Sequence, residues 1–269
     1  MKTIAVANRK GGTGKTTISS HLAGALAHRG YTVCLIDTDP QGHAALTVGL
    51  RKEPGLYNLL IENANFSDVL RQINPNAISV PDNAPQGHLF LLPSDERTQA
   101  IPVMDKNPFN LAQRLEELEN QFDYVIIDTA PTISLFDGTI YLAVEAILYV
   151  TECETLSLDG LKSGIKQITD FAPSRLKNSL PKIEVLGIVP NKYREKTATH
   201  VANLRAVQEK FGDLVWEPIA LRTILPEATT AGKLVFSLAP SSDAAAAMWD
   251  IADRFERAVE TWQSQKQTQ

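Results

Sequence analysis

The chain has 269 residues, of which 43% are hydrophobic and 21% charged, and its formal net charge is −5. This composition is ordinary for a globular protein with a large core, and it excludes a chain that is basic throughout. No apolar run is long enough to cross a bilayer and a strand begins at once, so we expect a cytoplasmic protein. Cys34 and Cys153 lie in apolar runs, which favours buried thiols over a disulfide or a metal site.

A glycine-rich turn lies between a predicted strand at 3–7 and a predicted helix at 18–28. Such a turn directs several backbone N–H groups to one point, and the helix N-terminus adds partial positive charge there. This combination favours a phosphate chain, with Lys15 reaching the β- and γ-phosphates and Thr16 ligating Mg²⁺. The turn therefore predicts a nucleotide-binding P-loop made of Lys10, Gly11, Gly12, Thr13, Gly14, Lys15, Thr16 and Thr17.

Two further predicted strands end in aspartates. The strand at 32–37 leads into Asp37 and Asp39, and the strand at 123–128 ends in Asp128. Ligands of open α/β sheets bind beyond the carboxyl ends of the strands, so these side chains are expected beside the P-loop. We assign Asp128 to a Mg²⁺-bound water, as in a Walker B element, and we expect residues 129–132 to form a loop beneath the γ-phosphate.

The rest of the chain alternates between weaker helix and strand patterns. Between Asp39 and Asp128 the sequence predicts helices at 56–60, 66–73 and 111–118 and a strand at 88–93. Beyond Asp128 it predicts strands at 146–150, 183–193 (with its following loop) and 215–219, and a helix that begins after Glu154.

A last helix is predicted at about 243–263, capped by Ser241 or Ser242. One stripe of this helix is expected to pack on the sheet, and 264–269 are expected to be a disordered tail. Because no linker separates two parts, we predict a single ATPase domain over 1–269. Its fold class is α/β, a doubly wound and mostly parallel sheet with helices on both faces. The packed stripe is Met248, Ala252, Phe255, Val259 and Trp262.

The P-loop departs from the regular G-x-x-x-x-G-K-[ST] pattern, because Arg9 stands where glycine is usual and Lys10 adds a second lysine. This variant resembles the deviant Walker A loop of the ParA/MinD family of ATPases, K-G-G-x-G-K-[ST]-[ST], over all eight residues. Residues 37–42 resemble the family's D-x-D-P-Q-G segment, and residues 222–233 resemble its R-x-x-x-x-E-A-x-x-x-G-K run. The chain is most similar to ParA proteins that lack an N-terminal DNA-binding extension.

The resemblance implies an ATP hydrolase that uses ATP and Mg²⁺, with Lys10, Lys15 and Asp39 acting in catalysis. It implies that Asp39 positions or activates the attacking water, that Asp37 lies near the Mg²⁺ ion and that the Asn191 amide pairs with the adenine edge. It also implies a face-to-face homodimer in the ATP state, in which Lys10 of each subunit contacts the phosphates held by the other.

Basic residues are concentrated in one part of the chain. Residues 160–235 contain 12 Lys and Arg against 7 Asp and Glu. Such a cluster binds the DNA backbone without reading its sequence, although a solvated helical face is the alternative explanation. Taken with the resemblance, it predicts binding to non-specific DNA. The residues assigned to this contact are Lys192, Arg194, Lys196, Arg205 and Arg222, with Lys210 in the same segment.

The family further implies a ParB-like adaptor protein on a plasmid or chromosome that stimulates a slow hydrolysis, and a nucleoid-associated ATP state. A protein organelle or cluster is an alternative cargo. A MinD-like membrane ATPase is another alternative, but residues 263–269 offer no apolar face, so no membrane is expected. An iron–sulfur relative needs ligating cysteines, and a metabolic kinase needs a substrate pocket that the sequence does not identify.

Overall fold

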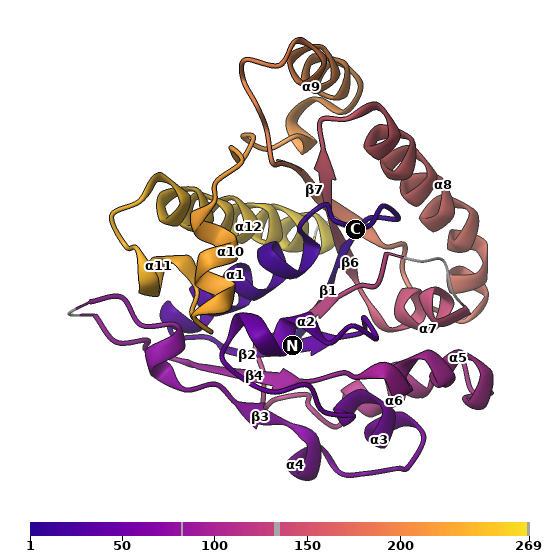
Figure 1. Cartoon of the computed structure of the whole chain (residues 1–269). Helices are drawn as coiled ribbons and strands as arrows, with labels where there is room; N and C mark the ends of the chain where they lie inside the picture. Colours follow the sequence, from indigo (N-terminus) through magenta and orange to yellow (C-terminus); the bar gives the residue numbers. More distant parts are fainter. Residues whose placement is uncertain (82, 132–134, 268–269) are drawn as a thin grey trace.

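The computed structural model describes residues 1–81, 83–131 and 135–267. These described residues form a seven-stranded sheet in the order β3-β4-β2-β5-β1-β6-β7 (Figure 1). Neighbouring strands run parallel, except that β3 is antiparallel to β4. The predicted fold class is therefore confirmed. The strands are β1 (Lys2–Ala7), β2 (Thr32–Asp37), β3 (Arg71–Gln72), β4 (His88–Leu92), β5 (Tyr124–Asp128), β6 (Ala146–Glu152) and β7 (Glu184–Asn191).

Helices cover both faces of the sheet, because buried strand residues point alternately to the two sides. In β1, Ile4 and Val6 join the core on one side, whereas Ala5 and Ala7 join the core on the other. The first side is covered by α1 (Lys15–His28), α2 (His43–Thr47), α10 (Ile224–Thr230), α11 (Val235–Leu238) and α12 (Asp243–Gln267).

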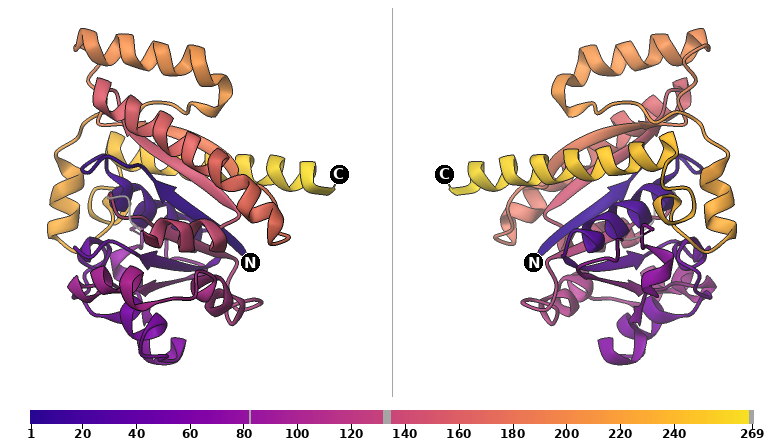
Figure 2. Two further views of the ribbon diagram at one scale, coloured as in Figure 1. Left: turned by 90° about the vertical axis from the view of Figure 1, so that its right-hand side faces the viewer. Right: turned by 90° about the vertical axis from the view of Figure 1, so that its left-hand side faces the viewer.

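The second side is covered by the helices from the middle of the chain. They are α3 (Gly55–Leu60), α4 (Phe66–Val69), α5 (Ile101–Met104), α6 (Asn110–Glu116), α7 (Leu135–Ala143), α8 (Thr155–Lys177) and α9 (Ala198–Phe211). Short 3₁₀ turns occur at η1 (Pro75–Ala77), η2 (Glu96–Ala100) and η3 (Gly212–Leu214). α9 projects at one end of the molecule, beyond the edge strand β7 (Figure 2).

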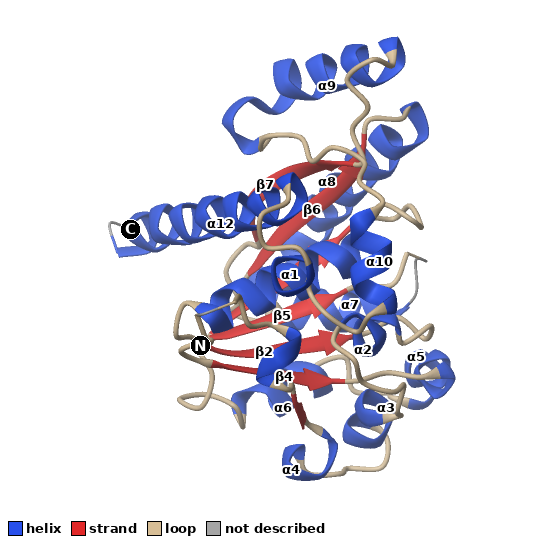
Figure 3. Ribbon diagram, turned by 60° about the vertical axis from the view of Figure 1, so that its left-hand side comes forward, coloured by secondary structure: helices blue, strands red, loops and turns tan. Residues whose placement is uncertain are grey.

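The central strands end at the same level, and this places the functional segments together (Figure 3). In the register of the sheet, Asp37 of β2 pairs with Asp128 of β5, and Val6 of β1 also pairs with Asp128. The P-loop follows β1 directly, so the two aspartates lie beside it, as the sequence predicts.

The C-terminal helix packs as expected but continues further. Ser242 caps it, since the Ala245 N–H donates to Ser242 Oγ at 3.2 Å. The predicted stripe from Met248 to Trp262 is buried in the core. The helix continues to Gln267, so the expected disorder is wrong for residues 264–267, and the last two residues lie outside the described part.

Two element predictions are wrong. The helix expected at 66–73 ends at Val69, because Arg71 and Gln72 pair with β4 as an antiparallel strand. The strand expected at 215–219 is replaced by the isolated bridges Ile188–Val215 and Tyr193–Ala220. Pro218 lies between these bridges, and a proline cannot donate a ladder hydrogen bond.

Both cysteines are buried free thiols, as the sequence predicts. In the described part of the chain, no helix combines the length and apolar character that spanning a bilayer requires.

Candidate functional site

The P-loop backbone strongly favours glycine at two positions. Gly12 has φ of 79° and Gly14 has φ of 95°, values that other residues rarely adopt. A Cβ atom on Gly14 would also lie 2.1 Å from Asn191 Nδ2. The loop ends where α1 begins at Lys15, so the N-terminal N–H groups of this helix face the site.

Lys15 is the buried cation of the loop, with only 6% of its surface exposed. Burial lowers its pKa, and the charges of Asp128 and Asp39 act in the opposite direction. The ammonium group donates to the Lys10 carbonyl oxygen at 3.4 Å, a long contact for a charged donor. Lys15 is therefore held in the site with most of its hydrogen-bonding capacity available for an anion.

The two buried aspartates differ in their partners. The Asp37 carboxylate accepts the backbone N–H groups of Asp39 at 2.9 Å and Ala44 at 3.0 Å, and so fixes the turn after β2. The Asp128 oxygens make no hydrogen bond of good geometry with the described residues, although the Thr16 and Ser19 hydroxyls lie close enough to favour the charged form of this carboxylate. Burial raises the pKa of both carboxyl groups, while the Thr16 hydroxyl and Lys15 favour charge on Asp128. An unpartnered buried carboxylate beside a threonine hydroxyl fits a hydrated divalent cation.

A cavity of about 590 Å³ opens beside the P-loop and is large enough for a nucleotide. Asp39 lies on its wall, where one carboxylate oxygen accepts the Gln41 N–H at 2.9 Å. The opposite wall comes from the end of β7 and from α10 with the segment before it. This wall contains Asn191, Lys192, Ala220, Leu221, Arg222, Leu225, Pro226 and Thr229.

Asn191 lies at the end of β7, is buried, and contacts the P-loop directly. Its amide nitrogen donates to the Thr13 carbonyl oxygen at 2.8 Å. The structure thus brings Asn191 to the nucleotide cavity through a contact with the P-loop backbone. Its predicted pairing with an adenine edge stays a prediction.

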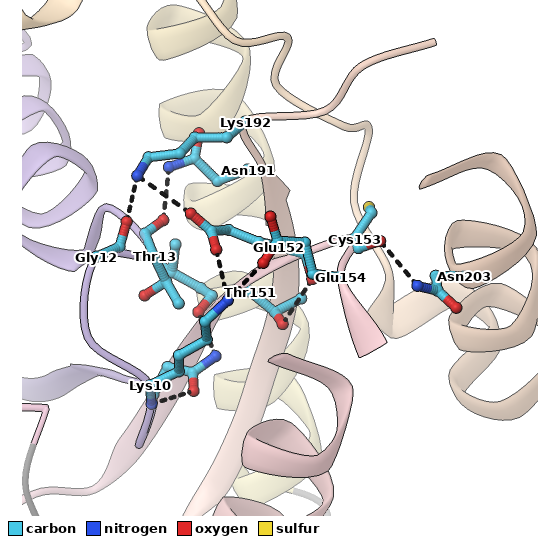
Figure 4. Close-up of polar contacts among 12 residues, drawn as sticks. Lys10, Gly12, Thr13, Thr151, Glu152, Cys153, Glu154, Asn191, Lys192 and Asn203 are labelled. Carbon is cyan, nitrogen blue, oxygen red and sulfur yellow. Dashed lines mark hydrogen bonds and ion pairs between the residues drawn. The ribbon is translucent and has the colours of Figure 1, made fainter. Parts of the chain in front are cut away.

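Lys10 is held by carboxylates at and after the end of β6 (Figure 4). Its ammonium group lies 3.0 Å from Glu152 and 2.7 Å from Glu154. The hydrogen bond to Glu154 raises the pKa of Lys10 and lowers that of Glu154. Glu152 also pairs with Lys192 at 3.1 Å, and Lys192 donates to the Gly12 carbonyl oxygen.

Sequence reasoning assigned no role to Glu152 or Glu154. The available signal was their place at the end of a buried strand, at the edge of the sheet that the P-loop also occupies.

The five residues assigned to DNA differ in their contacts. Arg194 and Lys196, in the loop before α9, and Arg205, on α9, are exposed. Lys192 instead pairs with Glu152 at the P-loop, and Arg222 lines the cavity and pairs with Asp243 at 3.1 Å. Two of the five, Lys192 and Arg222, therefore line the cavity, and Arg222 is exposed like the other three.

A family model described as an AAA domain matches residues 1–182. The sporulation initiation inhibitor protein Soj of Bacillus subtilis is 27% identical, over 93% of this chain and 96% of Soj. The chromosome partitioning protein ParA of Caulobacter vibrioides is 28% identical, over 87% of this chain and 86% of ParA. In fold, the chain is similar to the septum site-determining protein MinD of Pyrococcus horikoshii, solved with Mg-ADP. That match has a TM-score of 0.74 and 23% identity, over 93% of this chain and 94% of MinD.

Proposed function

The chain belongs to the ParA/MinD family of P-loop ATPases, and we propose that it forms an ATP-dependent homodimer that binds DNA without sequence preference. In this proposal a ParB-like adaptor protein links the dimer to a plasmid or chromosome and stimulates a slow ATP hydrolysis. The similarity to the chromosome partitioning protein ParA of Caulobacter supports this cargo. The whole chain acts as one ATPase domain, cytoplasmic and associated with the nucleoid when ATP is bound.

The nucleotide is ATP with Mg²⁺, and the cation supplies positive charge that stabilises the phosphate oxygens during phosphoryl transfer. Lys15 and the free N–H groups at the start of α1 bind the phosphates. Thr16 and Asp128 hold the cation, directly or through water, which is supported by the unpartnered Asp128 oxygens. Asp37 contributes by fixing the turn that carries Asp39, since backbone N–H groups occupy both of its oxygens.

Asp39 orients the attacking water in this proposal, because its carboxylate lies on the cavity wall and is fixed there by Gln41. Groups in this role typically contribute about 10²–10⁴-fold to the rate. Lys10 is not needed to complete the phosphate site within one subunit, since Lys15 already supplies a cation there. It therefore crosses the dimer interface and contacts the partner's phosphates, as an arginine finger does in trans.

The DNA contact is assigned to the outer basic residues Arg194, Lys196 and Arg205. Their exposure supports this role, because each can reach a phosphate by releasing counter-ions. Lys192 and Arg222 are instead assigned to the nucleotide cavity, because both line it and Lys192 pairs with Glu152 beside the P-loop. A dimer doubles the contacts along one duplex, so ATP and DNA binding are coupled through effective concentration.

The proposal depends most on one observation: the P-loop has a second lysine, Lys10, whose ammonium group pairs with Glu152 and Glu154. The test is light scattering and fluorescence anisotropy on random-sequence duplex, with ADP or a slowly hydrolysed ATP analogue, at two salt concentrations. We expect a dimer and tight, salt-sensitive DNA binding only with the ATP analogue. Monomers in both states would refute the dimer.

If the dimer forms but does not bind DNA, the ATP state must bind a different matrix. Liposome pelleting in the same nucleotide states then distinguishes a membrane from a protein organelle or cluster as the matrix.

A further inference from the structure

One carboxylate, Glu152, binds two lysines of the nucleotide site at once (Figure 4). Lys10 contacts its Oε2 atom at 3.0 Å, and Lys192 contacts its Oε1 atom at 3.1 Å. Because the two ammonium groups use different oxygens, one can leave without breaking the contact of the other.

The neighbouring carboxylate, Glu154, is in a different environment. The side chain of Glu154 is 53% exposed, whereas that of Glu152 is 12% exposed. If Lys10 moves away, water can solvate Glu154, but Glu152 is left largely without water. Leaving a buried charge without a partner is strongly destabilising. How easily Lys10 leaves therefore depends on whether Glu152 keeps another cation as its partner.

Lys192 is placed to remain with Glu152 after Lys10 has moved. It follows β7 with φ of 53°, an unusual conformation for a lysine, and its ammonium group also donates to the Gly12 carbonyl oxygen. The Gly12 contact and the Glu152 pair together fix this cation between the end of β6 and the P-loop. The arrangement does not depend on Lys10.

We propose that Lys192 is the retained counter-ion of Glu152, a positioning residue that allows Lys10 to leave for the partner subunit. This inference rests on the proposed function, in which Lys10 acts across an ATP-dependent dimer interface. In this proposal Lys192 controls dimer formation and does not contact DNA. In the monomer Glu152 forms ion pairs with both Lys10 and Lys192, and in the dimer it pairs with Lys192 alone.

The test is a double-mutant cycle on the dimer dissociation constant, measured by analytical ultracentrifugation without DNA and at a saturating concentration of an ATP analogue. Lys192→Met leaves Lys10 as the sole cation on Glu152, so we expect the dimer to weaken about tenfold. Glu152→Gln removes the charge that needs a counter-ion, so this variant dimerises at least as tightly as the parent. When Lys192→Met is combined with Glu152→Gln, its effect falls to within about twofold.

Two controls separate this role from general damage. Lys192→Arg keeps the positive charge and is expected to restore dimerisation, whereas Lys182→Met removes an exposed lysine with no assigned role and is expected to leave the dimer dissociation constant unchanged. Titration with a fluorescent nucleotide and thermal unfolding establish saturation and folding for each variant.

An equal effect of Lys192→Met with and without Glu152→Gln, or no effect in either case, would overturn the inference. So would a dimer of Glu152→Gln weaker than that of the parent, a result that does not need a folded Lys192→Met protein. Failure of the parent itself to dimerise with the ATP analogue is a different result, because it refutes the proposed function.

Discussion

The nucleotide site has two halves that are built differently. The motif half consists of the P-loop with Asp37, Asp39 and Asp128, and its groups are fixed by backbone contacts or by burial. The tip half consists of the groups at the ends of β6 and β7: Glu152, Glu154, Asn191 and Lys192. There, apart from Asn191, side chains that are 12–53% exposed are held by ion pairs with one another or with Lys10 of the P-loop.

This difference indicates a division of tasks. A carboxylate that accepts two backbone N–H groups cannot exchange partners without unfolding its turn. Ion pairs between partly exposed side chains contribute little stability and exchange readily. We therefore expect changes in the motif half to abolish nucleotide binding or chemistry, and changes in the tip half to alter the response to the nucleotide.

The largest effect is expected from Lys15→Ala in the motif half. Lys15 is the cation matched to the β- and γ-phosphates, and alanine leaves their charge uncompensated in a buried site. We expect no measurable ATP binding by isothermal titration calorimetry. A parent-like affinity would mean that the P-loop assignment is wrong.

Lys10→Ala tests the boundary between the halves, because Lys10 belongs to the P-loop but binds the tip half. We expect this variant to bind ATP and yet to remain monomeric by size exclusion with light scattering, since the contact in trans is lost. Normal dimerisation and hydrolysis would show that this protein does not use a ParA-type sandwich.

Asp39→Ala is expected to slow hydrolysis by about 10²–10⁴-fold while ATP binding and dimerisation persist. The physical reason is that Asp39 acts on the water and not on the nucleotide. Single-turnover phosphate release measures the rate, and light scattering checks the dimer. If turnover is unchanged, the role passes to another residue, with Asp37 next in line.

The motif half could be predicted from the sequence because its signals are local. Continuous apolar runs mark β2 and β5, and in a parallel sheet their terminal residues Asp37 and Asp128 meet at one edge. The glycine pattern of the P-loop needs only its flanking strand and helix for interpretation.

The tip half could not be predicted, because its contacts join residues far apart in the chain. Lys10 and Glu152 are separated by 142 positions, and Lys192 and Gly12 by 180. A charged residue after a predicted strand does not indicate which distant residue will form an ion pair with it. The end of the C-terminal helix also depends on a distant contact, because Lys266 pairs with Glu145 at 3.0 Å. Lys266 lies over the Trp262 ring as well, and both contacts favour the last turn.

His21 gives a pH test of the motif half, since it joins the P-loop helix to the core. Its Nδ1 atom contacts the Thr17 carbonyl oxygen at 2.7 Å, and its Nε2 accepts the Val235 N–H at 2.9 Å, which requires the neutral ring. Burial lowers the pKa of His21 from 6.5 to about 4. Below pH 6.5 the unfolded chain therefore binds a proton that the folded chain does not.

As the pH falls from 6.5 to 4, this linkage lowers the free energy of unfolding by about 3 kcal/mol, and the loss stops below pH 4. Urea unfolding at several pH values measures it. His21→Gln removes the titrating group, so its stability should change less over the same interval. An identical pH dependence in both proteins would assign the effect to other groups.

The smallest effect concerns the outer basic residues beyond the tip half. Arg194→Ala with Arg205→Ala removes two exposed cations, and each phosphate contact that is lost lowers the salt slope of binding by about one. We expect weaker DNA binding by the ATP-state dimer, a salt slope reduced by about two per subunit, and unchanged ATP hydrolysis without DNA.

The matched control is Arg51→Ala with Lys106→Ala, which removes two exposed cations near α3 and α5, on the side of β4. If the control weakens binding equally, net charge and not this surface attracts DNA. If neither pair matters while binding persists, the contact lies elsewhere on the dimer.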